Sequence, residues 1–340
     1  MTKSQIPNNT QILNFKFFKL FVAWCLVFGI CLLLGAWCLV LPVRAQSLSL
    51  GIYPPLLEVM IKPGKSITQV YKLSNEGEAD LVVKGEILAF NPLGEQGEIQ
   101  LSDQQSPAHE WISFQNADLG LGQNFAVKAG QSQQIVLKIK VPLEAKEDDY
   151  YLTLLFETQP SDLNEGLSEA RAQAKIGTNL LLTVSETGEP PRKAEIIEFK
   201  VQSAKLKVID SFTPPQFVLR IKNTGRSLFK PMGTITTTGW FGQKYPLNLL
   251  PENILTKSIR KIGCENDKET KICRLKAKFL LGPYSAKVEF GLDKISNDYA
   301  AQVNFIALPI KLFGVVFFII IILVFIIKLG QNRHKLSIDK

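Results

Sequence analysis

Two long apolar segments, one near each end, constrain this chain of 340 residues more than any other feature. The first runs from Phe21 to Leu41, and the second, from Leu312 to Ile327, is sixteen residues without a charge. At about 1.5 Å of helical rise per residue, sixteen residues span roughly 24 Å, and Leu308–Ile310 bring this close to a hydrocarbon core of ~30 Å. A buried core helix would usually have a polar face, and this run has none. We therefore predict one transmembrane helix over residues 305–328.

The first apolar segment has the features of an export signal. Lys16 and Lys19 precede it, and small residues, Val43 and Ala45, stand where a signal peptidase recognises its substrate. The sequence therefore predicts a signal peptide over residues 1–45, cleaved between Ala45 and Gln46. Because the apolar run is long for a signal peptide, an uncleaved membrane anchor is the alternative.

Basic residues beside the second apolar segment predict the orientation of the chain. Lys328, Arg333, Lys335 and Lys340 follow it directly. Positive charge collects on the cytoplasmic side of a membrane helix, so residues 329–340 are expected to be a basic cytoplasmic tail. With an export signal at the other end, we expect a single-pass type I protein of the cell membrane with its N-terminal region outside.

The net charge of +8 does not indicate a nucleic-acid partner, because the excess lies beside the apolar segments. Residues 46–304 contain 30 basic and 30 acidic residues. Binding to phosphates requires a basic surface on the folded part of the chain, which this balance does not supply. We expect no nucleic-acid binding.

The neutral middle is itself divided into an acidic and a basic half. Residues 46–189 contain 10 basic and 20 acidic residues, and residues 190–304 contain 20 basic and 10 acidic. This switch coincides with the proline-rich segment Glu189-Pro190-Pro191-Arg192, so we predict two domains, 46–188 and 189–304. The two halves either attract each other, meet different partners, or simply have differently charged solvated surfaces.

The middle of the chain has the pattern of β-strands. Short segments alternate apolar and polar residues between turn residues, as in Ile135, Leu137 and Ile139, and in Phe217, Leu219 and Ile221. The segments Tyr71–Gly77 and Leu219–Gly225 resemble each other, and each ends in Asn-X-Gly, where glycine could take a positive φ. We predict an all-β fold of two tandem immunoglobulin- or fibronectin-III-like sandwiches.

Cys264 and Cys273 are the two cysteines outside the first apolar segment. They flank a polar loop between two strand-like segments, which predicts a disulfide across a hairpin in an oxidising compartment. Zinc is the alternative, but two sulfurs without a nearby histidine are too few ligands.

Residues with catalytic potential are sparse. Outside the predicted tail there is one histidine, His109, without a Gly-X-Ser-X-Gly or His-Glu-X-X-His motif, and a loop position explains it better. Glu147-Asp148-Asp149 could offer oxygens to calcium, but it lacks alternating ligand spacing and is better explained as a solvated turn. We expect no cofactor, no metal and no enzymatic activity.

Six aromatic residues are candidates for binding by surface contact. Tyr53, Trp111, Tyr150 and Tyr151 lie in the first half, and Trp240 and Phe241 in the second. A saccharide could stack on the first group. Core packing is the alternative that we favour for Trp111, for at least one tyrosine and for the Trp240-Phe241 pair.

The first half contains a series of short motifs, which in chain order are Tyr53-Pro54-Pro55, Pro63-Gly64-Lys65-Ser66, Leu73-Ser74-Asn75, Gly97-Glu98-Ile99, Trp111-Ile112, Val141-Pro142 and Asp149-Tyr150-Tyr151. This order resembles the peptidoglycan-binding, immunoglobulin-like domain of the WxL-interacting surface proteins. In that family two sandwich domains lie between a signal peptide and a C-terminal membrane helix with a basic tail. The second half matches the family mainly through Asn223-Thr224-Gly225 and its position.

The resemblance implies a non-catalytic cell-surface adaptor whose first domain binds cell-wall peptidoglycan and whose second binds another surface protein. A membrane-anchored chaperone or assembly factor that lends a sheet edge to exported subunits is the alternative. An envelope hydrolase with a carboxylate pair is a third possibility, although no segment marks such a pair.

Overall fold

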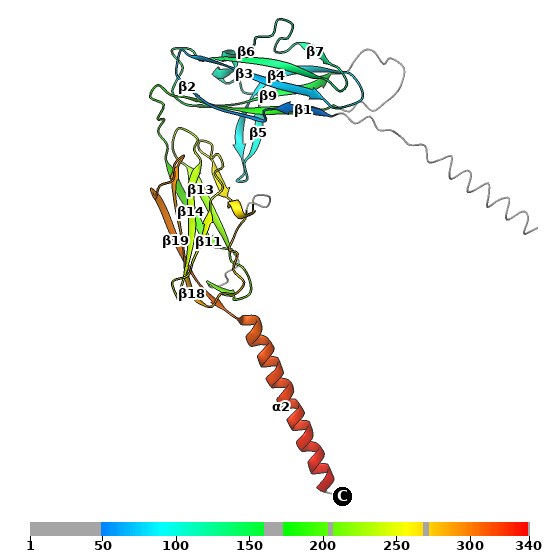
Figure 1. Cartoon of the computed structure of the whole chain (residues 1–340), viewed down its shortest axis with the longest axis vertical. Helices are drawn as coiled ribbons and strands as arrows, with labels where there is room; N and C mark the ends of the chain where they lie inside the picture. Colours follow the sequence, from blue (N-terminus) through cyan, green and yellow to red (C-terminus); the bar gives the residue numbers. More distant parts are fainter. Residues whose placement is uncertain (1–48, 160–172, 203–206, 268–271, 339–340) are drawn as a thin grey trace, which may run out of the picture. The chain divides into compact units, whose positions relative to one another are not determined.

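The computed structural model describes residues 49–159, 173–202, 207–267 and 272–338, with side chains up to Lys328. It contains two β-sandwiches followed by one apolar helix (Figure 1). The all-β sandwich class expected from the alternating segments is therefore correct. The predicted signal peptide and its cleavage site, Ala45–Gln46, lie outside the described residues.

The first sandwich consists of two sheets. One has the strand order β1-β3-β8-β6, and the other has the order β2-β10-β9-β4-β5, with β7 also paired to β4. The strands are β1 (Leu50–Tyr53), β2 (Leu56–Ile61), β3 (Ser66–Asn75), β4 (Leu81–Leu93), β5 (Glu98–Ser102), β6 (Ile112–Phe114), β7 (Asn124–Val127), β8 (Ser132–Lys140), β9 (Asp149–Gln159) and β10 (Lys175–Val184). A short 3₁₀ helix, η1 (Pro107–Trp111), precedes β6 and contains His109.

Period-two alternation produces the core of this sandwich. Every second residue of β8 is buried, namely Ile135, Leu137 and Ile139, while Lys140 is exposed. From the facing sheet, Leu152, Leu154 and Phe156 of β9 enter the same core. Successive strand side chains point to opposite faces, so each sheet presents one apolar face to the other.

The second sandwich also has two sheets, with orders β11-β13-β16 and β12-β19-β18-β14-β15; β17 pairs with β13. Its strands are β11 (Ala194–Val201), β12 (Val208–Asp210), β13 (Gln216–Asn223), β14 (Pro231–Gly239), β15 (Lys244–Asn248), β16 (Ile259–Ile262), β17 (Cys273–Arg274), β18 (Gly282–Leu292) and β19 (Tyr299–Leu308). Residues 185–193, which include the predicted linker, connect β10 to β11.

The internal repeat has a structural basis in two equivalent asparagines. Asn75 is buried, and its Nδ2 donates to the carbonyl oxygens of Ala79 (2.8 Å) and Val127 (3.0 Å). Asn223 does the same with Ser227 and Ile254, both at 2.9 Å. In each turn the N–H of the following glycine donates to the asparagine Oδ1. Strand β3 of the first sandwich and strand β13 of the second therefore each end at a buried asparagine. Its side chain forms hydrogen bonds with backbone groups of the turn that follows.

The expected role of glycine in these turns is wrong. Neither Gly77 nor Gly225 is among the glycines with positive φ. Gly225 is needed for a different reason, because a Cβ there would lie 2.5 Å from the backbone nitrogen of Lys193. The close approach of the linker therefore selects glycine at this position.

The apolar helix α2 (Ile310–Ile338) begins later than the sequence predicts. Residues Phe305–Leu308, assigned above to the membrane helix, form the end of β19 instead. Phe305 and Ala307 are buried in the second core, and Pro309 separates the strand from the helix. Among the described residues one helical segment, Ile310–Lys328, is long and apolar enough to cross a membrane, and none of it is buried.

The predicted disulfide between Cys264 and Cys273 is present and buried. It does not bridge a hairpin, because β16 and β17 do not pair with each other. Both pair with β13, β16 at Leu219–Lys222 and β17 at Gln216–Phe217. The disulfide thus closes a loop, with the 3₁₀ helix η3 (Glu265–Asp267), that interrupts one edge of this sheet.

We expect the double substitution Cys264→Ala with Cys273→Ala to lower the free energy of unfolding by about 2–3 kcal/mol, because it frees a loop of about ten residues in the unfolded chain. Calorimetry of the full chain in detergent measures the change, and reduced wild type should behave like the double variant. Free thiols in the unreduced, unfolded wild type would contradict the prediction.

Candidate binding site

The carboxylate of Asp149, the first residue of β9, joins the two sandwiches. From the first sandwich, Thr183 Oγ1 donates to Asp149 Oδ1 (2.8 Å) and Tyr151 OH donates to Oδ2 (2.6 Å). From the second, Ser227 Oγ donates to Oδ1 (3.0 Å) and the Leu228 N–H to Oδ2 (2.5 Å). Thr256 Oγ1 of the second sandwich adds a longer hydrogen bond to Oδ2 (3.4 Å), so five donors from both sandwiches converge on one half-buried carboxylate. Asp149 is not part of a solvated turn, as the acidic run suggested.

Tyr151 extends this junction. Its hydroxyl oxygen lies 2.5 Å from Thr256 Oγ1 and accepts from the Thr256 N–H (3.0 Å). Burial, together with the neighbouring Asp149 charge, raises the pKa of Tyr151 far above its usual value. The phenol therefore keeps its proton and remains a donor to Asp149.

A small apolar cluster surrounds these polar groups. Phe90 and Leu181 from the first sandwich pack with Leu228 and Leu255 from the second. The ring of Tyr151 stacks on Phe90 with 5.7 Å between centroids. Because apolar contact excludes water from the Asp149 network, each of its hydrogen bonds is strengthened and each unmade one is more costly.

Ion pairs across the junction follow the charge switch in the sequence. Arg220 Nε donates to Glu95 Oε2 (2.8 Å), which raises the pKa of Arg220, and Lys230 Nζ lies 2.8 Å from Glu58 Oε2. In both pairs the acid comes from the first sandwich and the base from the second. Solvent screens such partly exposed pairs, so they orient the sandwiches more than they stabilise them. The interpretation that the two halves attract each other is therefore supported at this junction.

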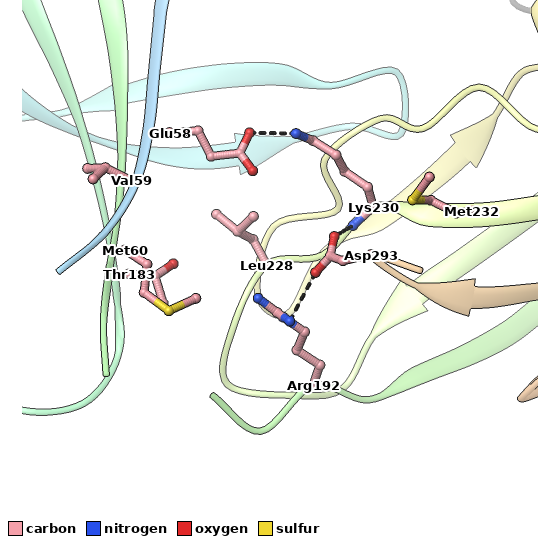
Figure 2. Close-up of a pocket in the computed structure, with 9 residues that line it drawn as sticks. All are labelled: Glu58, Val59, Met60, Thr183, Arg192, Leu228, Lys230, Met232 and Asp293. Atoms are coloured by element: carbon pink, nitrogen blue, oxygen red, sulfur yellow. Dashed lines mark hydrogen bonds and ion pairs between the residues drawn. The ribbon is translucent and has the colours of Figure 1, made fainter. Parts of the chain in front are cut away.

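A cleft of about 380 Å³ lies beside the junction (Figure 2). Its walls come from both sandwiches, and its lining residues are Glu58, Val59, Met60, Thr183, Arg192, Leu228, Lys230, Met232 and Asp293. Figure 2 shows Glu58 and Lys230 paired at one side and Arg192 and Asp293 paired at another.

The cleft offers adaptable apolar contact rather than reactive groups. Two of the three methionines of the chain, Met60 and Met232, line it, and flexible thioether side chains adjust to varied partners. Its carboxylates, Glu58 and Asp293, are paired with Lys230 and Arg192. No cluster of three or more metal-ligating side chains occurs in the described part of the chain.

Strand β2 borders this cleft and has a free edge. It is the terminal strand of its sheet and pairs with β10 on one side. The N–H of Asn179 donates to Pro55 O, and that of Ser185 donates to Ile61 O. Backbone groups alternate in direction, so odd-numbered residues face β10, whereas the N–H and C=O groups of Leu56, Glu58 and Met60 point outward.

The six predicted aromatic residues do not form one face. Trp111 is buried and contacts Tyr150 edge-to-face, with 4.6 Å between centroids, and Tyr151 lies in the junction. Tyr53 is 71 % exposed. The preference for core packing thus holds for Trp111.

The same preference is wrong for Trp240 and Phe241, which are 69 % and 76 % exposed and stack on each other. They lie in the turn between β14 and β15, where the chain leaves the sheet and neither side chain can reach the core.

Apart from Tyr151, sequence reasoning missed the residues that form the junction and the cleft. Asp149 was part of an acidic run, and Glu58 and Lys230 gave no local signal because 172 residues separate them. The available hint was the position of Asp149 directly before the strand Tyr150–Phe156. Because β9 and β10 are antiparallel, the start of β9 lies beside the end of β10. A short linker leads from that end of β10 to the second sandwich, so a carboxylate at the start of β9 lies close to it.

Comparisons with known proteins give distant similarities only. No family model and no curated protein matches the chain. Among solved structures, the class 5 fimbriae chaperone CfaA is 13% identical with a TM-score of 0.36 over 76% of this chain and 100% of its own. The E. coli chaperone DraB is 14% identical with a TM-score of 0.35, covering 77% and 96%. A PapD-like domain of human CEP192 is 16% identical with a TM-score of 0.29, covering 43% and 93%. Identities and TM-scores of this size do not transfer a function.

We expect Asp149→Ala to lower the free energy of unfolding by about 1–3 kcal/mol, because it leaves donors from both sandwiches without an acceptor. Thermal unfolding of the full chain in detergent measures this. Asp118→Ala, at an exposed aspartate of the first sandwich, is the matched control. Equal stability of the two variants would show that Asp149 does not join the sandwiches.

Proposed function

We propose that this chain is a non-catalytic surface protein, anchored in the membrane by α2, that binds an extended segment of another exported protein along the free edge of β2. One observation carries the proposal: β2 presents unpaired backbone groups directly beside a cleft lined by methionines. An added strand would satisfy the outward groups of Leu56, Glu58 and Met60, and every second side chain would face the cleft. This proposal is a specific form of the alternative predicted from the sequence, a membrane-anchored chaperone or assembly factor for exported subunits.

Membrane anchoring is supported by the composition and exposure of α2. Its first nineteen residues, Ile310–Lys328, leave their apolar side chains uncovered by either sandwich. Water is a poor solvent for such a surface, whereas lipid accepts it. Following the sequence prediction, we propose a single-pass type I arrangement with both sandwiches outside the cell and the basic end of the chain inside.

Exposed, unpaired strand edges usually carry devices against unwanted pairing, such as lysine or proline. Strand β2 has neither among Leu56–Ile61, and its one charge, Glu58, is paired with Lys230. Leu56 and Met60 are exposed on the same face. The same composition would be a liability in a free-standing sheet. In a protein that binds extended segments, it provides the required contact surface.

The edge-binding proposal predicts that Leu56→Lys with Met60→Lys abolishes peptide binding. The probe is an array of short overlapping peptides that cover the proteins exported by the same cell, incubated with the full chain in detergent. Val70→Lys, at an exposed apolar position of β3 in the other sheet, should keep wild-type binding. Surface changes of this kind should alter stability by no more than about 0.5 kcal/mol. Binding that survives the double substitution would refute a role for β2.

The resemblance to WxL-interacting proteins adds a second contact, with peptidoglycan, and one observation favours it. Tyr53 is exposed at the end of β1 and could stack against a sugar ring. We expect the full chain to pellet with purified peptidoglycan and Tyr53→Ala to pellet severalfold less. Phe241→Ala, at an equally exposed aromatic in the second sandwich, is the control. Failure of the wild type to pellet would end the wall-binding proposal and leave the edge-binding proposal intact.

A further inference from the structure

Five large apolar side chains are exposed at one end of the second sandwich: Phe212, Trp240, Phe241, Phe279 and Leu281. We call them the end patch. They come from three separate segments, the residues after β12, the β14–β15 turn and the residues before β18.

Strand register brings these segments to the same end of the sheet. Gly239 pairs with Tyr284, Gly282 with Ala307, and Asp210 with Leu308. The last residues of β12, β14 and β19 therefore lie at the same end of the sheet as the first residues of β18.

The end patch is an ordered surface, not a set of scattered side chains. Trp240 and Phe241 stack with 5.6 Å between ring centroids, and Phe212 and Phe279 pack at 5.2 Å. The indole of Trp240 lies over Gly282, where a Cβ would come within 3.0 Å of Trp240 Cε3. Large clustered apolar surfaces on soluble proteins usually mark a site of contact with a partner or a membrane.

The end patch is tied to the start of α2. Pro309 alone separates β19 from the helix. The carboxylate of Asp210 accepts hydrogen bonds from the N–H of Lys311 (3.1 Å) in the first helical turn and from the N–H of Phe212 (3.2 Å) in the end patch. A carboxylate at a helix N-terminus satisfies free N–H groups, so this contact holds the first turn of α2 against the Phe212 segment.

The length of α2 fixes where a bilayer must begin. Ile310–Ile327 contains eighteen residues, or about 27 Å of helix, against a hydrocarbon core of ~30 Å. Only Lys311 among them is charged, and its long side chain can extend to the headgroups, so use of the whole apolar run places the hydrocarbon boundary in the first turn of α2, Ile310–Phe313. The headgroup layer extends roughly 5–7 Å further, about one helical turn, which reaches the segments that carry the end patch.

Charge around the end patch also fits a lipid surface. Residues 240–244 and 274–283 contain four basic residues and no acidic one: Lys244, Arg274, Lys276 and Lys278. All four are exposed. The acid beside Phe212, Asp210, is occupied by the N–H groups of Lys311 and Phe212. Aromatic side chains at headgroup depth, flanked by basic residues that attract anionic phosphates, are typical of membrane interfaces.

We propose that the end patch lies in the headgroup layer of the bilayer that receives α2, so that the second sandwich is seated on the membrane surface. The inference rests on the proposed membrane anchoring and deepens it. The apolar side chains of the end patch contact the upper acyl chains, and the neighbouring basic side chains contact lipid phosphates.

Quenching of tryptophan fluorescence by brominated lipids tests this seating. The full chain is reconstituted in vesicles of phosphatidylcholine and phosphatidylglycerol with bromine near the top of the acyl chains. Trp24→Phe and Trp37→Phe are present in every protein, so that Trp111 and Trp240 supply the signal. The matched control is Ile295→Trp with Trp240→Phe, which moves the exposed tryptophan to the β18–β19 turn at the opposite end of the sheet.

We expect brominated lipid to quench Trp240 severalfold more strongly than the tryptophan at position 295, with the Trp240→Phe protein giving the Trp111 background. If the two tryptophans are quenched equally, and the vesicles retain the protein through an alkaline wash, the seating is overturned but the membrane anchoring stands. Loss of the protein in that wash overturns both. If Trp240 is protected from quenching only in nanodiscs that hold two copies of the chain, the end patch contacts a second copy. That result would also overturn the seating.

Discussion

The Asp149 carboxylate is the interaction on which the relation between the two sandwiches depends. A charged oxygen pair at a domain junction is stable only when hydrogen bonds replace the water it has lost. Here the first sandwich supplies the hydroxyls of Thr183 and Tyr151. The second sandwich supplies the hydroxyl of Ser227 and the N–H of Leu228. Since each sandwich supplies only part of the set, separation would leave groups on both sides unsatisfied unless water replaced them. The network therefore favours one arrangement over others of similar apolar area.

The position of the cleft beside the free edge of β2 follows from this junction. Thr183 stands on β10, which pairs with β2, so the strand that Asp149 fixes through Thr183 is the neighbour of the free-edge strand. Lys230 follows two residues after Leu228 and reaches Glu58 on β2. The same contacts that join the sandwiches thereby bring Met60 and Met232 to one cleft. A binding edge on a single sandwich would lack this second wall and the side-chain selectivity that it allows.

Local pattern predicted the features whose cause is local. The alternation of Ile135, Leu137 and Ile139 was sufficient to identify a strand and its buried face. The Asn-X-Gly repeat identified two related turns, although the buried amide of Asn75, and not glycine, determines their shape. Phe305–Leu308 was misassigned because an apolar run at the end of a strand and the start of a membrane helix have the same composition. The deciding contacts, of Phe305 and Ala307 with the second core, are long-range.

Features that depend on contacts between the sandwiches could not be predicted in the same way. The charge switch near residue 190 indicated that the halves differ, but not which acids would meet which bases. Nothing in the local sequence distinguishes Glu147, Asp148 and Asp149 from one another. Of the three, only Asp149 accepts hydrogen bonds from the second sandwich. Likewise, Trp240 and Phe241 are large apolar residues of the kind that usually enters a core, but their position in the β14–β15 turn leaves them exposed.

The proposed seating at the membrane would give the second sandwich a mechanical role that follows from its strand lengths. Strand β14 begins at Pro231, next to the junction residue Leu228, and ends at Gly239, next to the end patch. Nine residues at about 3.3 Å each span roughly 30 Å, so the cleft stands at that order of distance from the patch. A one-residue connection to α2 and the hydrogen bond from Lys311 to Asp210 oppose tilting at the membrane end. The Asp149 network opposes rotation at the other end. In the proposed arrangement, the free edge of β2 would stand at a fixed height above the bilayer, where it could receive an extended segment of an exported protein before that segment pairs with another chain.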